Sequence, residues 1–327
     1  MRSFLKNQVG SHIRFLQRAQ KYRPIGVDIG DSGVKMVQLS DGGRQMSLVA
    51  GGCRNRPDDV EFGSSRWQRW AINAISELTD NERFHGRHVV AAMPDQNVFL
   101  EHIRMPRTAE GATSEDKVQT ALLSKVKNRL PFKADDAIIK YISAEDGNVV
   151  VIAVQRTIVD RHLAIYENTN LQIKSIVVWP VALINSYTSF FGRRQADVGA
   201  VVVLIEIDSN QTRLVACRHK NLLFAHSVAV GASQLDSEEM VTRLVVELTA
   251  CKRQFASMYK NAQVERLIFL AGHESQSACT AIARQLEIPA QIGDCLTAVK
   301  IPNPSGLGID RRNSQVSWAT AFGLSLS

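Results

Sequence analysis

The feature that most constrains the fold of this chain is a pattern of strands and polar turns that occurs twice. Residues 25–51 are predicted to form three strands separated by two turns, and residues 200–231 repeat that order about 178 residues later. Aligning Asp28 with Glu206 places the next turn thirteen residues downstream in both copies. A spacing shared over that distance indicates two related domains rather than a solenoid, whose repeats run about 20–50 residues.

The first turn of the first copy combines an acid with exposed backbone groups. A buried strand ends at Ile29, and the turn leads into a second strand that begins at Val34. Backbone N–H groups freed by glycine suit phosphate oxygens, an acid suits a divalent cation, and a lysine adds positive charge. The residues that supply these groups are Asp28, Gly30, Asp31, Ser32, Gly33 and Lys35. A plain hairpin closed by glycine and polar residues fits the same pattern about equally well.

Composition indicates an ordinary soluble protein whose excess charge lies in one short tail. The chain has 327 residues, enough for two domains, and a net charge of +7. Residues 1–27 carry six basic residues and no acid, so the remaining body is nearly neutral, which argues against a nucleic-acid binder. No apolar run is long enough to span a membrane as a helix. The five cysteines are far apart, which is typical of reduced thiols in a cytosolic protein.

The basic leader, residues 1–23, is compatible with two states. Drawn as a helix, residues 1–22 place apolar side chains on one half of the wheel and basic side chains on the other, as in segments that lie on an anionic membrane. Gly10-Ser11 interrupts this helix, so we expect an unstructured leader first and membrane-surface contact second. An organellar transit peptide has the same composition.

Two further segments carry information about organisation. Residues 95–170 are predicted to form strand, helix, strand, strand and helix, with a capping-box-like helix start at Thr113-Ser114, and we interpret this compact unit as an insertion. Before it, a helix over 67–78 has an apolar face that includes Trp67, which indicates a core position. Near the end of the chain an apolar strand, 264–270, meets a helix through Gly272. Such turns bind nucleotides in open α/β sheets, although a simple strand–helix turn fits equally well.

This arrangement of two halves resembles the actin, Hsp70 and sugar-kinase superfamily. More specifically, it resembles the PilM proteins of type IV pilus and related secretion systems, which are cousins of the division protein FtsA. The resemblance covers about residues 24–326. It rests on Asp28–Lys35, on Met93-Pro94 with Ile103–Pro106, on Leu130–Phe132, on Arg253 in a long helix and on Ala319–Leu326.

The resemblance implies an α/β protein with an actin-like (ribonuclease H-like) fold, duplicated domains and an inserted 1C subdomain. The boundaries implied are 1–23 for the leader, 24–94 with 171–196 and 316–327 for the first domain (1A), 95–170 for 1C, and 198–315 for the second domain.

The resemblance also implies a cytoplasmic scaffold at the inner face of the inner membrane. The cytoplasmic N-terminal segment of a PilN-like membrane protein would dock on the first domain near 1C, and PilO-like and motor proteins would be indirect partners. ATP with Mg²⁺ would bind between the domains, with Asp28 holding the metal through its carboxylate. The resemblance implies no catalytic residue.

The nucleotide motifs of that family are only partly present. The first loop keeps its acid, glycine, hydroxyl and lysine, but in the second loop the pattern Asp-x-Gly is Glu206-Ile207-Asp208 and only Thr212 remains. Later glycine pairs become Gly231-Ala232 and Gly272-His273, and Ala250 replaces an expected glutamate. An acid facing a phosphate adds repulsion of ~1 kcal/mol in water and several-fold more in a cleft. We therefore expect ATP/Mg binding to be weak or lost, unless Mg²⁺ bridges Asp208 to phosphate.

Two alternative functions stay open. An active ATPase or sugar kinase needs a base that takes the proton of the attacking hydroxyl, and the sequence points to no residue in that role. An FtsA-like membrane-tethered cytoskeletal protein usually carries an amphipathic anchor at its C-terminus, whereas this sequence ends in Leu324–Ser327 without basic residues.

Overall fold

The computed structural model describes residues 22–41, 45–81, 84–105, 115–272, 275–301, 309 and 317–327. Several predictions concern residues outside these ranges: the basic leader up to residue 21, Pro106, the helix start at Thr113-Ser114, and His273 of the predicted purine-binding turn. Among the described helices, none is both long and apolar enough to cross a membrane.

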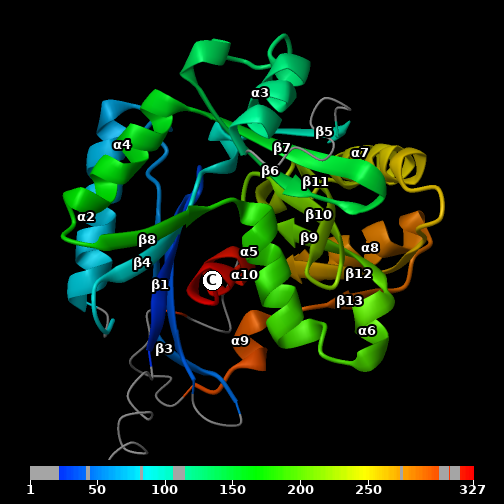
Figure 1. The fold of residues 1–327 in the computed structure, drawn as a ribbon. Helices are drawn as coiled ribbons and strands as arrows, with labels where there is room; N and C mark the ends of the chain where they lie inside the picture. The colour runs from blue at the N-terminus through cyan, green and yellow to red at the C-terminus, as the bar shows by residue number, and fades with distance from the viewer. Residues whose placement is uncertain are drawn as a thin grey trace, which may run out of the picture.

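The first sheet has the strand order β3-β2-β1-β4-β8 (Figure 1). Its first three strands form the predicted antiparallel meander, and β4 and β8 run parallel to β1. We call this sheet and its helix α2 (Ser65–Asn81) the first lobe. The strands are β1 (Tyr22–Ile29), β2 (Gly33–Ser40), β3 (Ser47–Asn55), β4 (His88–Ala92) and β8 (Gln172–Val177).

The second sheet repeats this topology with the order β11-β10-β9-β12-β13. Its first three strands again form an antiparallel meander, and β12 and β13 continue the sheet in parallel. The structure thus confirms the duplication inferred from spacing. We call this sheet and its helices the second lobe. Its elements are β9 (Val201–Ile207), β10 (Thr212–Arg218), β11 (Asn221–Val228), α7 (Glu238–Met258), β12 (Val264–Ala271), α8 (Gln276–Leu286) and β13 (Ala290–Ile292).

A third sheet, with the order β5-β7-β6, forms the inserted unit at the top of Figure 1. Its elements follow the order expected from the sequence, and the unit has an apolar core of its own. Asp146 and Gly147 turn the chain between β6 and β7 with φ of 56° and 71°. The elements are β5 (Phe99–Arg104), α3 (Glu115–Val126), β6 (Ala137–Ser143), β7 (Asn148–Gln155) and α4 (Arg156–Glu167).

Two helices lie between the lobes and join them (Figure 1). Helix α5 (Trp179–Ser186) continues into a π turn at Tyr187–Phe191, and α10 (Ala319–Ser325) packs against both α5 and β1. Two further short helices are α6 (Gln195–Gly199) and α9 (Cys295–Ala298), of which α9 adds Cys295 and Leu296 to the buried cluster between the lobes. Apolar side chains of both sheets meet α5 and α10 in one buried cluster, so the lobes share a core.

The period of two along each strand decides which side chains face the space between the lobes. In β1, Ile25, Val27 and Ile29 pack beneath α2, which leaves Gly26 and Asp28 on the face toward α10. In β9, Val202 and Leu204 belong to the shared core, and Glu206 continues on that face. The alternation therefore brings acids from both lobes to the same interior region.

Candidate functional site

The β1–β2 turn forms the first half of the candidate site. Asp28 pairs with Lys35 in the antiparallel register, and the N–H of Gly30 donates to the carbonyl of Gly33 over 2.9 Å. A Cβ on Gly33 would lie 2.2 Å from the carbonyl oxygen of Arg54, so this position requires glycine. The loop adopts the tight hairpin that its sequence predicts.

The β9–β10 turn forms the other half. The N–H of Asp208 donates to the carbonyl of Gln211 over 2.9 Å, and the hydroxyl of Thr212 donates to the carbonyl of Val230 over 2.7 Å. Gly231 lies against this turn, where a Cβ would come within 2.3 Å of the N of Gln211. Gly231 and Thr212 therefore hold the second turn against the end of β11.

The two turns bind each other directly. The Nζ of Lys35 donates to Oδ1 of Asp208 over 2.9 Å, and the hydroxyl of Ser32 lies 3.3 Å from Oδ2 of the same carboxylate. Asn210 also donates to Asp31 over 2.9 Å. The groups that would receive a phosphate are thus occupied by a carboxylate of the chain itself.

Burial and pairing act in opposite directions on the charges of this pair. Burial would lower the pKa of Lys35, but the carboxylates of Asp208, Asp28 and Glu206 outweigh that effect and raise it. Burial would raise the pKa of Asp208, but Lys35 and Arg213 lower it. Both members are therefore ionised at neutral pH.

Arg213 is the functional residue that the sequence reasoning did not identify. It is 1% exposed on β10, and its Nη1 donates to Oε2 of Glu206 over 3.0 Å. The same guanidinium lies 3.6 Å from Asp95 and 4.0 Å from Asp28. Arg213 precedes the apolar run Leu214–Cys217 in β10, and a cation inside a strand predicted to be buried was the available signal, because a buried cation requires acidic partners.

The two remaining acids have different surroundings. Glu206 accepts hydrogen bonds from the hydroxyls of Ser317 and Thr320, at 2.9 and 2.8 Å, and from the N–H of Thr320 at the start of α10. It therefore holds the N-terminus of that helix in place. For Asp28, burial raises the pKa to about 6, although Arg213 and Lys35 act in the opposite direction.

Gly272 follows the last residue of β12 next to the second turn, since Ala271 pairs with Ile207 in the parallel register. Its carbonyl accepts the N–H of Ser275 over 3.2 Å just before α8, which makes a strand–helix turn. The predicted site residues of both lobes thus converge on one region. They do not fit Mg–ATP as arranged, because Lys35 and Ser32 already bind Asp208. Within the described ranges, no group of three or more potential ligands is arranged to hold a metal.

A second candidate site is a hollow between the first lobe and the inserted unit that leaves about 30 Å³ of space. We call it the α2/α4 groove. Within the described part of the chain, Nε1 of Trp67 and Nδ1 of His162 are buried there without hydrogen-bond partners. Burial lowers the pKa of His162 to about 4, so its ring is neutral. The lining residues are Gly63, Trp67, Gln68, Pro94, Asn97, Ile158, Arg161 and His162.

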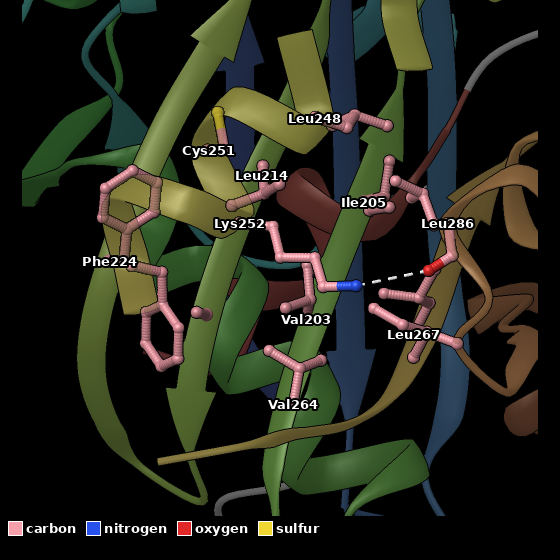
Figure 2. A pocket seen from close by; sticks show the side chains of 13 residues that line it. Val203, Ile205, Leu214, Phe224, Leu248, Cys251, Lys252, Val264, Leu267 and Leu286 are labelled. Carbon is pink, nitrogen blue, oxygen red and sulfur yellow. Dashed lines mark hydrogen bonds between the residues drawn. The ribbon is translucent and has the colours of Figure 1, made fainter. Parts of the chain in front are cut away.

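A third hollow lies inside the second lobe, between its sheet and helices α7 and α8 (Figure 2). Its walls are almost entirely apolar, and at its edge the Nζ of Lys252 lies 3.4 Å from the carbonyl of Leu286. It leaves about 30 Å³, space for one or two water molecules at most. We interpret it as a packing gap in the core rather than a ligand site.

Comparison with known proteins identifies the family. The model of the family "Type IV pilus assembly protein PilM" matches residues 26–251. No curated protein sequence matches the chain.

Solved structures share the fold at low sequence identity. One described as the PilM–PilN type IV pilus biogenesis complex is 19% identical, with 93% of this chain and 98% of that chain covered and a TM-score of 0.72. The ethanolamine utilization protein EutJ from Carboxydothermus hydrogenoformans is 12% identical, with 93% and 89% covered and a TM-score of 0.50. A Bacteroides thetaiotaomicron protein described as having an actin-like ATPase fold and unknown function is 10% identical, with 87% and 94% covered and a TM-score of 0.47.

The family match spans most of the chain, and the duplicated sheets with a joining pair of helices and an inserted unit agree with it. This protein has an actin-like fold and belongs to the type IV pilus assembly protein PilM family.

Proposed function

We propose that this protein is a cytoplasmic scaffold of a type IV pilus or related secretion platform, at the inner face of the inner membrane. It binds the N-terminal cytoplasmic segment of a PilN-like membrane protein and has lost nucleotide binding. Family membership supports the setting, and a PilN-like partner is suggested by the complex that the fold resembles. The observation that carries the loss of nucleotide binding is the contact of Lys35 with Asp208.

Nucleotide binding would require the chain to give up this contact. A triphosphate reaching Lys35 would have to displace Asp208 and leave that carboxylate buried without its cation. Removing one partner of a buried ion pair costs about 3–5 kcal/mol, a large share of the free energy available to a ligand of micromolar affinity.

Isothermal titration with Mg–ATP tests this part of the proposal. We expect no measurable heat of binding to the wild-type protein, because the ammonium group of Lys35 is already paired with the carboxylate of Asp208. Asp208→Gly removes the competing carboxylate and is expected to gain affinity, whereas Asp208→Gly combined with Lys35→Ala is not. Micromolar affinity in the wild-type protein would contradict the proposal.

The α2/α4 groove is the place we propose for the peptide. It lies where the first lobe meets the inserted unit, and Trp67 is one of its lining residues. The indole N–H of Trp67, which can only donate a hydrogen bond, is buried behind this lining without an acceptor among the described residues. A buried donor without an acceptor is unfavourable, and a backbone carbonyl of an extended peptide would satisfy it once binding opens the lining onto the indole. The neutral ring of His162 offers a second polar atom beside it.

Titration with a synthetic peptide of the PilN-like protein tests the groove. Trp67→Phe keeps the aromatic ring and removes the N–H, so we expect affinity to fall about tenfold, as for one lost hydrogen bond to a buried group. Trp70→Phe, on the same helix but outside the groove lining, is the matched control and should bind like the wild type. Failure of a panel of such peptides to bind the wild-type protein would overturn the proposal.

A further inference from the structure

One short turn belongs to both candidate sites. The 3-10 turn η1 spans Asp95–Asn97 and follows β4. Pro94 and Asn97 line the α2/α4 groove, while the two residues between them, Asp95 and Gln96, point to the second lobe. The groove and the contact between lobes are therefore separated by a single turn of backbone.

The contacts of this turn with the second lobe are polar and specific. The side-chain amide of Gln96 donates to that of Gln211 over 3.0 Å, and the hydroxyl of Ser227 donates to Oδ2 of Asp95 over 3.1 Å. Oδ2 of Asp95 also lies 3.6 Å from Nε of Arg213. We call these contacts of Asp95 and Gln96 the η1 latch.

The backbone of η1 is a tight, hydrogen-bonded turn. The N–H of Asn97 donates to the carbonyl of Pro94, and that of Val98 donates to the carbonyl of Asp95, both over 3.0 Å. Such a tight turn, begun by a proline whose φ is fixed, moves as one body. A shift of the groove wall at Pro94 or Asn97 would therefore carry the carboxylate of Asp95 with it.

The latch is also incompletely satisfied. Among the described residues, Oδ1 of Asp95 and Nε of Arg213 have no hydrogen-bond partner, although both are buried. The 3.6 Å between Arg213 and Asp95 is an ion-pair distance, and a movement of a few tenths of an ångström would turn it into a hydrogen bond. The geometry therefore leaves room for the latch to tighten.

We propose that occupation of the α2/α4 groove tightens the η1 latch, so that peptide binding and contact between the lobes strengthen each other. The identity of the ligand as a peptide rests on the function proposed above. The ligand that strengthens the contact between the lobes is then bound in the α2/α4 groove. The region between the two turns is already occupied by the ion pair of Lys35 with Asp208. Linkage requires the effect to be reciprocal, so loosening the latch from the second lobe weakens peptide binding by the same factor.

Titration of the PilN-like peptide against latch variants tests the coupling. Gln211→Ala with Ser227→Ala removes both hydrogen bonds to η1 from the second lobe and leaves every groove residue unchanged. We expect the Kd of the peptide to rise about 5- to 20-fold, within the range typical of coupled sites. Ser233→Ala is the matched control, because its hydroxyl bonds only within the second lobe, and it should leave the Kd unchanged.

A groove-filling variant tests the coupling without any peptide. Ile158→Trp places a ring in the groove, and we expect slower amide hydrogen exchange in residues 211–213 and 226–228, provided that thermal unfolding shows the variant to be folded. Unchanged exchange there would overturn the coupling. If the wild type binds the peptide and Gln211→Ala with Ser227→Ala binds it with the same Kd, the coupling is wrong but the proposed function is unaffected. Absence of binding to the wild type would overturn the proposed function, and Ile158→Trp would then decide the coupling.

Discussion

Six buried charged side chains lie between the lobes, and the acids among them differ in how closely they contact a cation. The acids are Asp28, Asp95, Glu206 and Asp208, and the bases are Lys35 and Arg213. Asp208 and Glu206 have direct hydrogen bonds to a cation, whereas Asp28 has only a 4.0 Å contact with Arg213. Burial therefore dominates at Asp28 and raises its pKa to about 6, although Arg213 and Lys35 act in the opposite direction.

We expect Asp208→Asn to destabilise the protein by about 3–5 kcal/mol at pH 7, because Lys35 is then a buried cation without its carboxylate. The pKa of Asp208 is lowered in the folded protein, so its contribution is complete above its usual pKa and is lost as the pH falls toward the folded value. Urea unfolding at pH 7 measures this effect. Asp208→Leu with Lys35→Met removes both charges and should recover most of the loss, and a loss below 1 kcal/mol in Asp208→Asn would contradict the ion-pair assignment.

The contribution of Asp28 to stability depends on pH in the opposite direction from that of Asp208. Its pKa rises from the usual 3.8 to about 6 on folding, so between these values the folded chain holds a proton that the unfolded chain has released. Stability then decreases as the pH rises through this window, by ~3 kcal/mol in total. Asp28→Asn should be more stable than the wild type at pH 8 and should lose that advantage near pH 4. A stability difference that does not change with pH would show that Asp28 is ionised throughout.

The first loop was the part of the site that the sequence predicted best. Its residues are contiguous, and glycine and polar residues fix a local turn. The partner of Lys35 lies 173 residues away, and strand periodicity gives burial but not which distant side chain a buried charge meets. For the same reason the sequence indicated a buried strand around Arg213 without identifying its acids, and Trp67 was predicted on the core face without its unsatisfied N–H.

At the scale of elements, the close approach of α10 to its neighbours fixes the geometry between the lobes. A Cβ on Gly323 would lie 1.8 Å from the carbonyl oxygen of Ala182 in α5, and a Cβ on Gly26 would lie 2.2 Å from that of Ala321. The apolar pattern at the end of the chain predicted the helix correctly. Its position between the sheets depends on these glycine contacts, and the spacing of apolar residues does not predict which backbones approach each other.

We expect Gly323→Ala to destabilise the protein by more than about 3 kcal/mol, since the backbones of α5 and α10 must separate and open a gap in the shared core. Thermal unfolding measures this loss as a fall in Tm. Gly199→Ala, in α6, is the control, because nothing lies within 4 Å of its added Cβ and its Tm should stay within a few degrees. Equal Tm values for the two variants would contradict the close packing of α10 on α5.

At the scale of the whole molecule, the lobes are joined by an apolar core rather than by a hinge alone. Val37 and Leu39 of the first sheet, Val202 and Leu204 of the second, and Phe322 of α10 belong to one buried cluster. The inserted unit has an apolar core of its own around α3, while Val150 on the other face of β7 joins the shared cluster. Beside this apolar contact it has polar contacts with the second lobe, including the ion pair of Glu145 with Arg218 and the bond from the N–H of Ala225 to the neutral ring of His102.

This arrangement predicts that the two lobes unfold together. A core that spans both cannot be lost from one lobe without exposing apolar surface of the other, so a partly unfolded state with one intact lobe is strongly disfavoured. Calorimetry should therefore show one main transition for the lobes, and amide exchange in β1 and β9 should report the same free energy of opening. Helix α3 belongs to the separate core of the inserted unit and is expected to open at a lower free energy, seen as faster exchange in residues 118–126. Different opening free energies for β1 and β9, beyond about 1–2 kcal/mol, would mean that the shared cluster does not couple the lobes.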